Sequence, residues 1–184
     1  MGIRISTRLI MPVFVLIISL LSLQTQAQLR MYSGSYVGNG VDDRLISGIG
    51  FQPDMVIVKQ LDASNEAQIR LSNMPDGISK QMVGSTTAYL DRIQSFDTDG
   101  FVVGVNNDVN AVGKNYIFMA FQTGSKFVIG TYNGDGTTGR PIDGLGFQPD
   151  LVYLIPTNDQ RVTYKTTTIS GTNAASFGGD ICSC

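Results

Sequence analysis

The chain has 184 residues, of which 21 are glycine and 15% are charged, and its formal net charge is −2. A typical globular domain carries about 25% charged residues, and a nucleic-acid-binding surface needs clusters of Lys and Arg that this acidic, sparsely charged chain does not offer. The sequence contains no histidine, which excludes the usual general base, the commonest metal ligand and every Ser–His or Cys–His nucleophile pair. The length suits one domain, or one domain and part of another.

Residues 1–27 have the pattern of a secretory signal peptide. Arg4 and Arg8 precede an apolar run of about 15 residues from Leu9 to Leu23, and small residues follow up to Ala27. A membrane-spanning helix needs about 20 apolar residues, so we expect a signal-peptide helix that is cleaved after Ala27 rather than a permanent anchor. The prediction is a secreted or cell-surface protein with no stable membrane span after cleavage, and a net charge of −4 for the mature chain.

From residue 30 onward the pattern predicts β-strands, because short apolar or alternating runs are separated by Gly, Asn, Asp and Pro. Residues 106–114 are predicted to form a polar loop, and no segment after the signal peptide has a sustained helical period. We therefore expect an all-β fold, an antiparallel β-sandwich of jelly-roll-like form. The predicted strands cover residues 30–37, 44–46, 55–61, 67–71, 79–83, 86–90, 92–96, 101–105, 116–121 and 125–132.

One stretch of the chain occurs twice. Residues 48–56, Gly-Ile-Gly-Phe-Gln-Pro-Asp-Met-Val, return with two conservative changes as residues 144–152, 96 positions later. The same offset relates Tyr36 to Tyr132 and Arg44 to Arg140, so we predict a first repeat at residues 28–124 and a partial second repeat at 125–184. The second repeat lacks counterparts of residues 97–100 and 116–121, which favours a fragment of a longer repeat protein over a half-repeat that completes the first domain.

The duplicated motif is expected to shape the backbone. Its glycines suit positive φ angles, its prolines suit the start of a strand, and its phenylalanines are predicted core residues. The aspartates are expected to accept hydrogen bonds from backbone amides at the strand entry. These motif residues are Gly48, Gly50, Phe51, Pro53 and Asp54 in the first repeat, and Gly144, Gly146, Phe147, Pro149 and Asp150 in the second.

Three blocks together resemble a known family. They are residues 48–59, residues 95–104, and Val109-Asn110 with Gly113 and residues 116–121. Their order and spacing are similar to a β-rich domain of unknown function found in phage tail-associated proteins and in large secreted bacterial proteins, often in tandem. The resemblance implies structural motifs and supplies no catalytic residues, and Ile155 departs from it by standing where Lys59 stands in the first repeat.

Two sets of residues are candidates for binding. Asp97, Asp99, Asn106 and Asp108 offer oxygen ligands for Ca²⁺, although their spacing is not that of an EF-hand, and the alternative is a hairpin turn followed by a polar loop. Tyr32, Tyr36 and Tyr132 lie near glycine-rich turns and are candidates to stack on sugar rings, the alternative being ordinary packing within strands.

The remaining candidates are the two cysteines and the acidic residues. Cys182 and Cys184 are two apart in an expected strand, at the limit of the Cα separation for a disulfide, so partners elsewhere remain an alternative. Paired carboxylates of a glycosidase are disfavoured, because the acids sit mostly at turn positions.

The sequence therefore favours a non-enzymatic structural or adhesive repeat module of an exported bacterial protein, with no cofactor. Its expected partners are neighbouring repeats and glycans or other cell-surface polymers. The alternative is a carbohydrate-binding module, in which Ca²⁺ is a structural ion.

Overall fold

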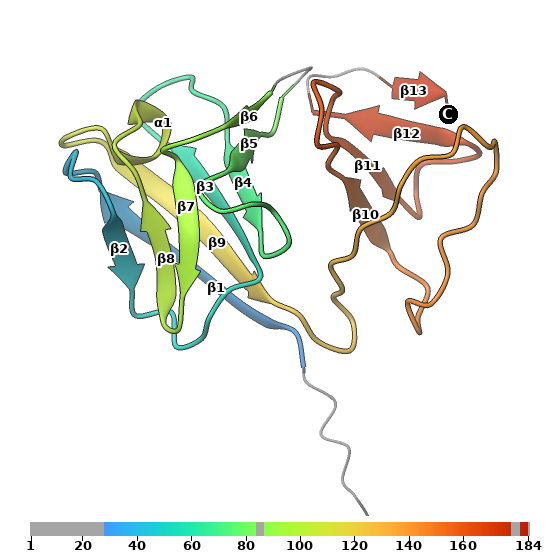
Figure 1. Cartoon of the computed structure of the whole chain (residues 1–184), viewed down its shortest axis with the longest axis horizontal. Helices are drawn as coiled ribbons and strands as arrows, with labels where there is room; N and C mark the ends of the chain where they lie inside the picture. Colours follow the sequence, from blue (N-terminus) through green and yellow to red (C-terminus); the bar gives the residue numbers. More distant parts are fainter. Residues whose placement is uncertain (1–27, 84–86, 178–180, 184) are drawn as a thin grey trace, which may run out of the picture.

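The computed structural model describes residues 28–83, 87–177 and 181–183 of the chain. The signal-peptide prediction lies outside the described residues. Within them the fold is almost entirely β, with antiparallel pairing throughout, as the sequence predicts (Figure 1). No helix among the described residues has the length and apolarity to cross a membrane.

The first repeat is a sandwich of two antiparallel sheets. In the six-stranded sheet the spatial order is β1 (Arg30–Val37), β9 (Asn115–Gln122), β3 (Met55–Gln60), β4 (Gln68–Leu71), β5 (Ser79–Gln81) and β6 (Ala88–Tyr89). The three-stranded sheet contains β2 (Arg44–Ser47), β8 (Gly100–Val103) and β7 (Ile93–Asp97). A single-turn helix, α1 (Asn107–Asn110), interrupts the loop that the sequence predicts after β8, because the Asn106 side chain caps it by accepting from the amide of Asp108 at 2.9 Å.

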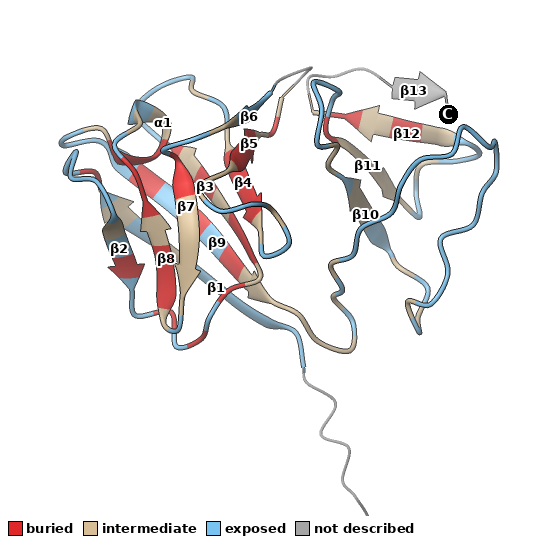
Figure 2. Ribbon diagram, in the orientation of Figure 1, coloured by how far each residue is buried: buried red, intermediate tan, exposed pale blue. Residues whose placement is uncertain are grey.

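The main core lies between these two sheets. Alternation along β3 and β9 sends Val56, Val58, Phe118 and Ala120 inward, where they meet Phe101 and other residues of β8. Figure 2 shows the buried residues gathered between the sheets of the first repeat, whereas β10 to β12 are mostly intermediate or exposed. The first repeat is therefore a closed sandwich.

The second repeat reproduces only part of this sandwich. Its single sheet has the order β10 (Leu151–Leu154), β11 (Thr163–Thr166), β12 (Asn173–Ser176) and β13 (Ile181–Ser183). This order matches β3-β4-β5-β6. Val152 lies opposite Lys165 as Val56 lies opposite Arg70, so the offset between the repeats falls from 96 residues in β10 to 95 in β11, and one residue fewer separates these two strands. The duplication seen in the sequence is thus a duplication of half a sheet.

The predicted strand at residues 125–132 is wrong. Within this segment only an isolated bridge between Gly124 and Phe127 forms, and residues 128–150 contain no strand. The segment corresponds to β1, whose partner in the first repeat is β9. Among the described residues no strand takes the place of β9 beside this segment, so no neighbouring strand there accepts its hydrogen bonds.

The second repeat packs against the outer face of the six-stranded sheet. Alternation along β3 and β4 sends Met55 and Ile69 to this face, and they join Met82 in a second apolar cluster. Partly buried residues from the second half of the chain complete the cluster: Phe127, Ile129, Ile155 and Phe177. The two repeats therefore share one apolar contact surface.

Candidate functional site

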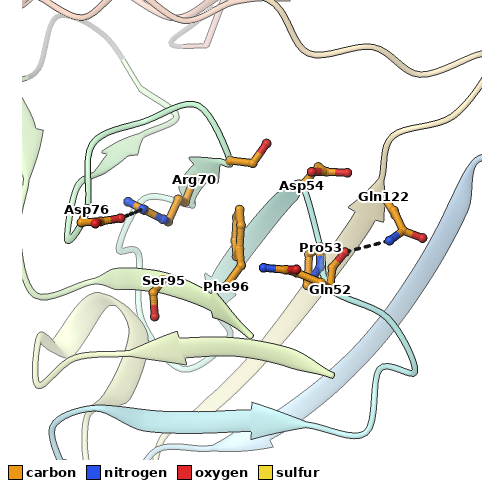
Figure 3. Close-up of a pocket in the computed structure, with 9 residues that line it drawn as sticks. Gln52, Pro53, Asp54, Arg70, Asp76, Ser95, Phe96 and Gln122 are labelled. Atoms are coloured by element: carbon orange, nitrogen blue, oxygen red, sulfur yellow. Dashed lines mark hydrogen bonds and ion pairs between the residues drawn. The ribbon is translucent and has the colours of Figure 1, made fainter. Parts of the chain in front are cut away.

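A pocket opens at the end of the first sandwich where the duplicated motif leads into β3. Its volume is about 320 Å³, and Figure 3 shows that residues from both sheets line it. Gln52, Pro53 and Asp54 come from the motif, while Arg70 lies on β4 and Phe96 on β7. The pocket thus joins the motif to parts of the chain that are distant in sequence.

The motif loop is held in place by Asp99, which lies in the turn between β7 and β8. Its two carboxylate oxygens accept from the amides of Gly48 at 3.0 Å and Gly50 at 2.6 Å. These glycines have φ angles of 89° and 81°, a region that residues with a Cβ rarely adopt. Phe51 is therefore directed into the core, where it is buried, and Gln52 is left exposed at the pocket.

Asp54 joins the ends of three strands. Its carboxylate Oδ2 accepts from both the amide of Thr123 at 2.8 Å and its hydroxyl at 2.7 Å, just after β9. Its backbone amide donates to the carbonyl of Phe121, and its carbonyl accepts from the amide of Ser72 after β4. The aspartate of the motif thus fixes the strand entry, and its other oxygen, Oδ1, has no hydrogen bond among the described residues.

Arg70 forms the buried wall of the pocket and is only 3% exposed. Its Nη1 donates to the carbonyl of Pro75 at 2.8 Å and to that of Ile78, and its Nη2 pairs with the exposed Asp76 at 3.5 Å. Burial lowers the pKa of Arg70, and the Asp76 carboxylate opposes this effect. The guanidinium therefore holds the loop between β4 and β5, while its Nε is buried without a hydrogen-bond partner among the described residues.

A β-bulge places Phe96 at the pocket. The register of β7 against β8 shifts between Ile93 and Ser95, so Gln94 is an extra residue. Strict alternation would place Ile93 and Phe96 on opposite faces, whereas the bulge lets both pack against the main core. The Phe96 ring lies within 5.7 Å of the Arg70 guanidinium and stands in the middle of the pocket in Figure 3.

Comparison with known protein families gives a match over residues 30–131 to a family described as a domain of unknown function, DUF7483. The match covers more than half of the chain. The chain belongs to the DUF7483 family. No curated protein and no solved structure matches the chain.

The second repeat carries only part of the pocket found in the first repeat. Lys165 takes the place of Arg70. Its Nζ donates to the carbonyls of Ile169 and Gly171 in the following loop and to that of Asn173 at the start of β12. The hydrogen bond of Ser72 to Asp54 also has a counterpart, from the amide of Thr167 to the carbonyl of Asp150 at 3.2 Å. Among the described residues no strand faces the second sheet as β7 faces the first, so this part of the chain shows the wall made by β7 once.

The four predicted calcium ligands do not come together. Asp97 and Asp99 lie at the turn between β7 and β8, whereas Asn106 and Asp108 lie at α1, at the opposite end of the sandwich (Figure 1). Asp108 pairs with Arg92 at 2.9 Å and accepts from two buried or partly buried glutamines, Gln68 and Gln81. No group of three or more Asp, Glu, Cys or His residues suited to a metal forms within the part of the chain described.

The three predicted sugar-binding tyrosines are also separated. The Tyr36 ring stacks on Tyr116 at 5.1 Å in the core, and its hydroxyl donates to the carbonyl of Val109 at 2.6 Å. Tyr32 stays largely exposed on β1, with its ring 5.9 Å from that of Phe118. Tyr132 lines a cleft of about 810 Å³ between the repeats.

Tyr132 is exposed although its local contacts repeat those of Tyr36. Arg140 lies 5.9 Å from the Tyr132 ring and donates to the carbonyl of Asn133, as Arg44 lies 5.3 Å from Tyr36 and donates to that of Val37. The local structure is thus the same in both repeats. In the part of the chain that the structure describes, no strand covers Tyr132 as β9 covers Tyr36, and Tyr132 is 50% exposed.

Neither cysteine is among the residues that line the pocket at Phe96. Cys182 lies in β13, where its backbone is opposite Ala174, and Cys184 lies outside the described residues. The disulfide prediction therefore stays a prediction.

Sequence reasoning identified the motif but missed the pocket. The sequence places Arg70 and Phe96 in two predicted strands, at residues 67–71 and 92–96, and does not indicate that their side chains meet. A lone arginine within an otherwise strand-like run is the one indication that the sequence contains, because arginine is almost never fully buried unless its hydrogen bonds are satisfied.

Proposed function

We propose that this chain is a non-enzymatic structural module of an exported bacterial protein, in which β-sandwich repeats pack directly on one another. Its resemblance to domains that occur in tandem in large secreted proteins and phage tail-associated proteins supports this role. In such an array the rigid sandwiches set the spacing, and the loops at their ends meet other cell-surface polymers.

The observation that carries the proposal is the environment of Lys80 on β5. Its side chain is 2% exposed, and its ammonium donates to the carbonyls of Pro156 at 2.7 Å and Asn158 at 2.6 Å. A buried ammonium is costly unless its hydrogen bonds are satisfied. Both acceptors belong to the second repeat, so the first repeat buries this charge correctly only while the second is docked.

The apolar cluster between the repeats supports the same conclusion. Ile69 is fully buried on the outer face of the six-stranded sheet, although that face would be open to water in an isolated sandwich. Phe127, Ile155 and Phe177 from the second half of the chain cover it. Burial of apolar area contributes about 25 cal/mol per Å², which favours a fixed arrangement of the two repeats.

The acidic residues support a structural role over a catalytic one. Asp54 accepts from Thr123, Asp99 accepts from two motif amides, and Asp108 pairs with Arg92. A glycosidase needs two carboxylates facing each other across a bound sugar. Here these three carboxylates instead hold strand ends and loops.

Hydrogen–deuterium exchange on the mature chain tests the proposal. In Lys80→Met the carbonyls of Pro156 and Asn158 lose their donor, so amides of β10 and β11 should exchange about tenfold faster or more, since a change of about 1.4 kcal/mol is tenfold. Lys114→Met is the matched control, because Lys114 is exposed and its side chain makes no hydrogen bond to the described residues. Equal protection of β10 and β11 in the two variants would show that the repeats are not held by this contact and would overturn the proposal.

A further inference from the structure

We infer that the pocket formed by the Gln-Pro-Asp segment, β4 and β7 of the first repeat binds a neutral polyhydroxylated ligand the size of one sugar ring. This binding role is additional to the packing of repeats. It rests on the size of the pocket, on polar groups without partners, on the Phe96 ring and on the balance of charge.

The size suits a small ligand. Binding pockets for small molecules have volumes of about 300–1,000 Å³, and this pocket, at about 320 Å³, lies at the lower end. It is open to solvent at the end of the sandwich (Figure 3). A single ring or the terminal residue of a glycan therefore fits better than a long segment of polymer.

The pocket presents several polar groups that have no partner within the described chain. The Gln52 side chain is exposed and makes no hydrogen bond, although its backbone carbonyl accepts from Gln122 at 3.2 Å. The hydroxyls of Ser72 and Ser95 are likewise without partners among the described residues, as is Asp54 Oδ1. Donors and acceptors are thus mixed, as a ligand with many hydroxyl groups requires, because each hydroxyl both donates and accepts.

Phe96 supplies an apolar surface among these polar groups. Its ring is partly buried against the core and faces the pocket between Arg70 and the motif. A pyranose ring has a face of C–H groups and a rim of hydroxyls, so it matches one aromatic ring surrounded by polar side chains. A uniformly apolar ligand would leave the polar groups unpaired, which costs free energy.

The charges disfavour ionic ligands. An anion would meet the carboxylates of Asp54 and Asp76, while the only cation of the pocket, Arg70, already faces Asp76 and two carbonyls. A cation drawn to Asp54 Oδ1 would share the pocket with the Arg70 guanidinium and would lose part of its hydration shell, which costs free energy. A neutral hydroxyl or carbonyl oxygen is the group that avoids both penalties.

The second repeat provides an internal control. It retains the motif as Gln148, Pro149 and Asp150, but within the described residues no side chain stands beside this motif as Phe96 stands beside the first. If the complete pocket binds the ligand, the chain binds one molecule, whereas binding by the motif alone would give two. The pocket also faces away from the contact between repeats, because Arg70 and Ile69 are adjacent on β4 and point to opposite faces.

The experiment is a titration of the ¹⁵N-labelled mature chain, followed by NMR, with D-glucose, D-galactose and N-acetyl-D-glucosamine up to millimolar concentrations and above. Inorganic phosphate serves as the anionic probe. At least one sugar should shift the side-chain amide resonances of Gln52 and Gln122 with a stoichiometry of one, and phosphate should not. Shifts with phosphate alone, or with none of the probes, overturn the inference.

Two matched variants locate the site. Gln52→Ala should raise the Kd of the bound sugar about two- to tenfold, because one hydrogen bond is lost, while Gln148→Ala should leave the Kd unchanged. Neither glutamine side chain makes a hydrogen bond to the described residues, so neither change is expected to affect folding. Equal effects of the two variants, or a stoichiometry of two, would place binding outside the Phe96 pocket and overturn the inference, and this outcome is independent of whether the repeats stay docked.

Discussion

Asp99 is the residue whose removal tests most directly how the duplicated motif is held. In Asp99→Ala the amides of Gly48 and Gly50 lose their acceptors, which lie at 3.0 Å and 2.6 Å. A hydrogen bond to a charged group contributes about 1.5–3 kcal/mol, and the lower end applies because this carboxylate is partly exposed. We expect a loss of about 3 kcal/mol in the free energy of unfolding, a large part of the about 5–15 kcal/mol typical of a domain.

Urea unfolding of residues 28–184, followed by circular dichroism, measures this loss, and thermal unfolding should show a Tm lower by about 6–12 °C. Asp99→Asn should lose about half as much, because an amide retains one acceptor oxygen. Asp143→Ala is the control, since Asp143 is exposed and makes no hydrogen bond or ion pair with the described residues. If Asp99→Ala matches this control to within about 0.5 kcal/mol, the motif loop is held by other contacts and the reasoning fails.

Tyr36→Phe should destabilise the protein to urea by about 1–2 kcal/mol, because a carbonyl of α1 loses its donor, whereas Tyr132→Phe should have no effect. Burial also raises the pKa of Tyr36 above its ordinary value of 10.0, so its contribution is complete below about pH 10 and is lost at higher pH, and the alkaline fall in Tm should be smaller in Tyr36→Phe. Gly38→Ala should cost about 2 kcal/mol or more in urea unfolding, because the new Cβ would lie 2.1 Å from a backbone oxygen, whereas a Cβ at its counterpart Gly134 would meet no atom within 4 Å and Gly134→Ala should be neutral. Chelation with EDTA should leave the Tm unchanged, because the four predicted calcium ligands are split between two ends of the sandwich; a lower Tm would contradict this. Intact-mass measurement of the exported protein should show cleavage after Ala27, and a retained leader would contradict it.

The strands of the first repeat were predictable because their evidence is local. Alternating apolar residues and the glycines between them describe the pleat and the turns over a few residues at a time. The duplicated motif is local evidence of the same kind, and β10 follows its second copy as β3 follows the first. The strand predicted at residues 125–132 failed because a strand also needs a neighbour, and the neighbour of its counterpart is β9, which lies about 80 residues later in the first repeat.

The pocket at Phe96 could not be predicted, because it depends on a β-bulge and on contacts between strands that are distant in the sequence. The bulge at Gln94 turns Phe96 toward the core, although alternation predicts the opposite face. The predicted calcium ligands do not meet because strand direction separates residues that are close in sequence. β8 carries the chain from one end of the sandwich to the other, so Asp99 and Asp108, nine residues apart, are held at opposite ends.

By itself the sequence determined an all-β chain, a duplicated stretch and the backbone role of the Gly-Phe-Gln-Pro-Asp motif, because glycine, proline and alternation act on the backbone residue by residue. The tertiary structure alone decided which residues meet. Asp54 binds Thr123 across 69 residues, and Lys80 binds Asn158 across 78. Such contacts depend on strand order and register, which come from the packing of whole sheets, and they build both the pocket and the contact between the repeats.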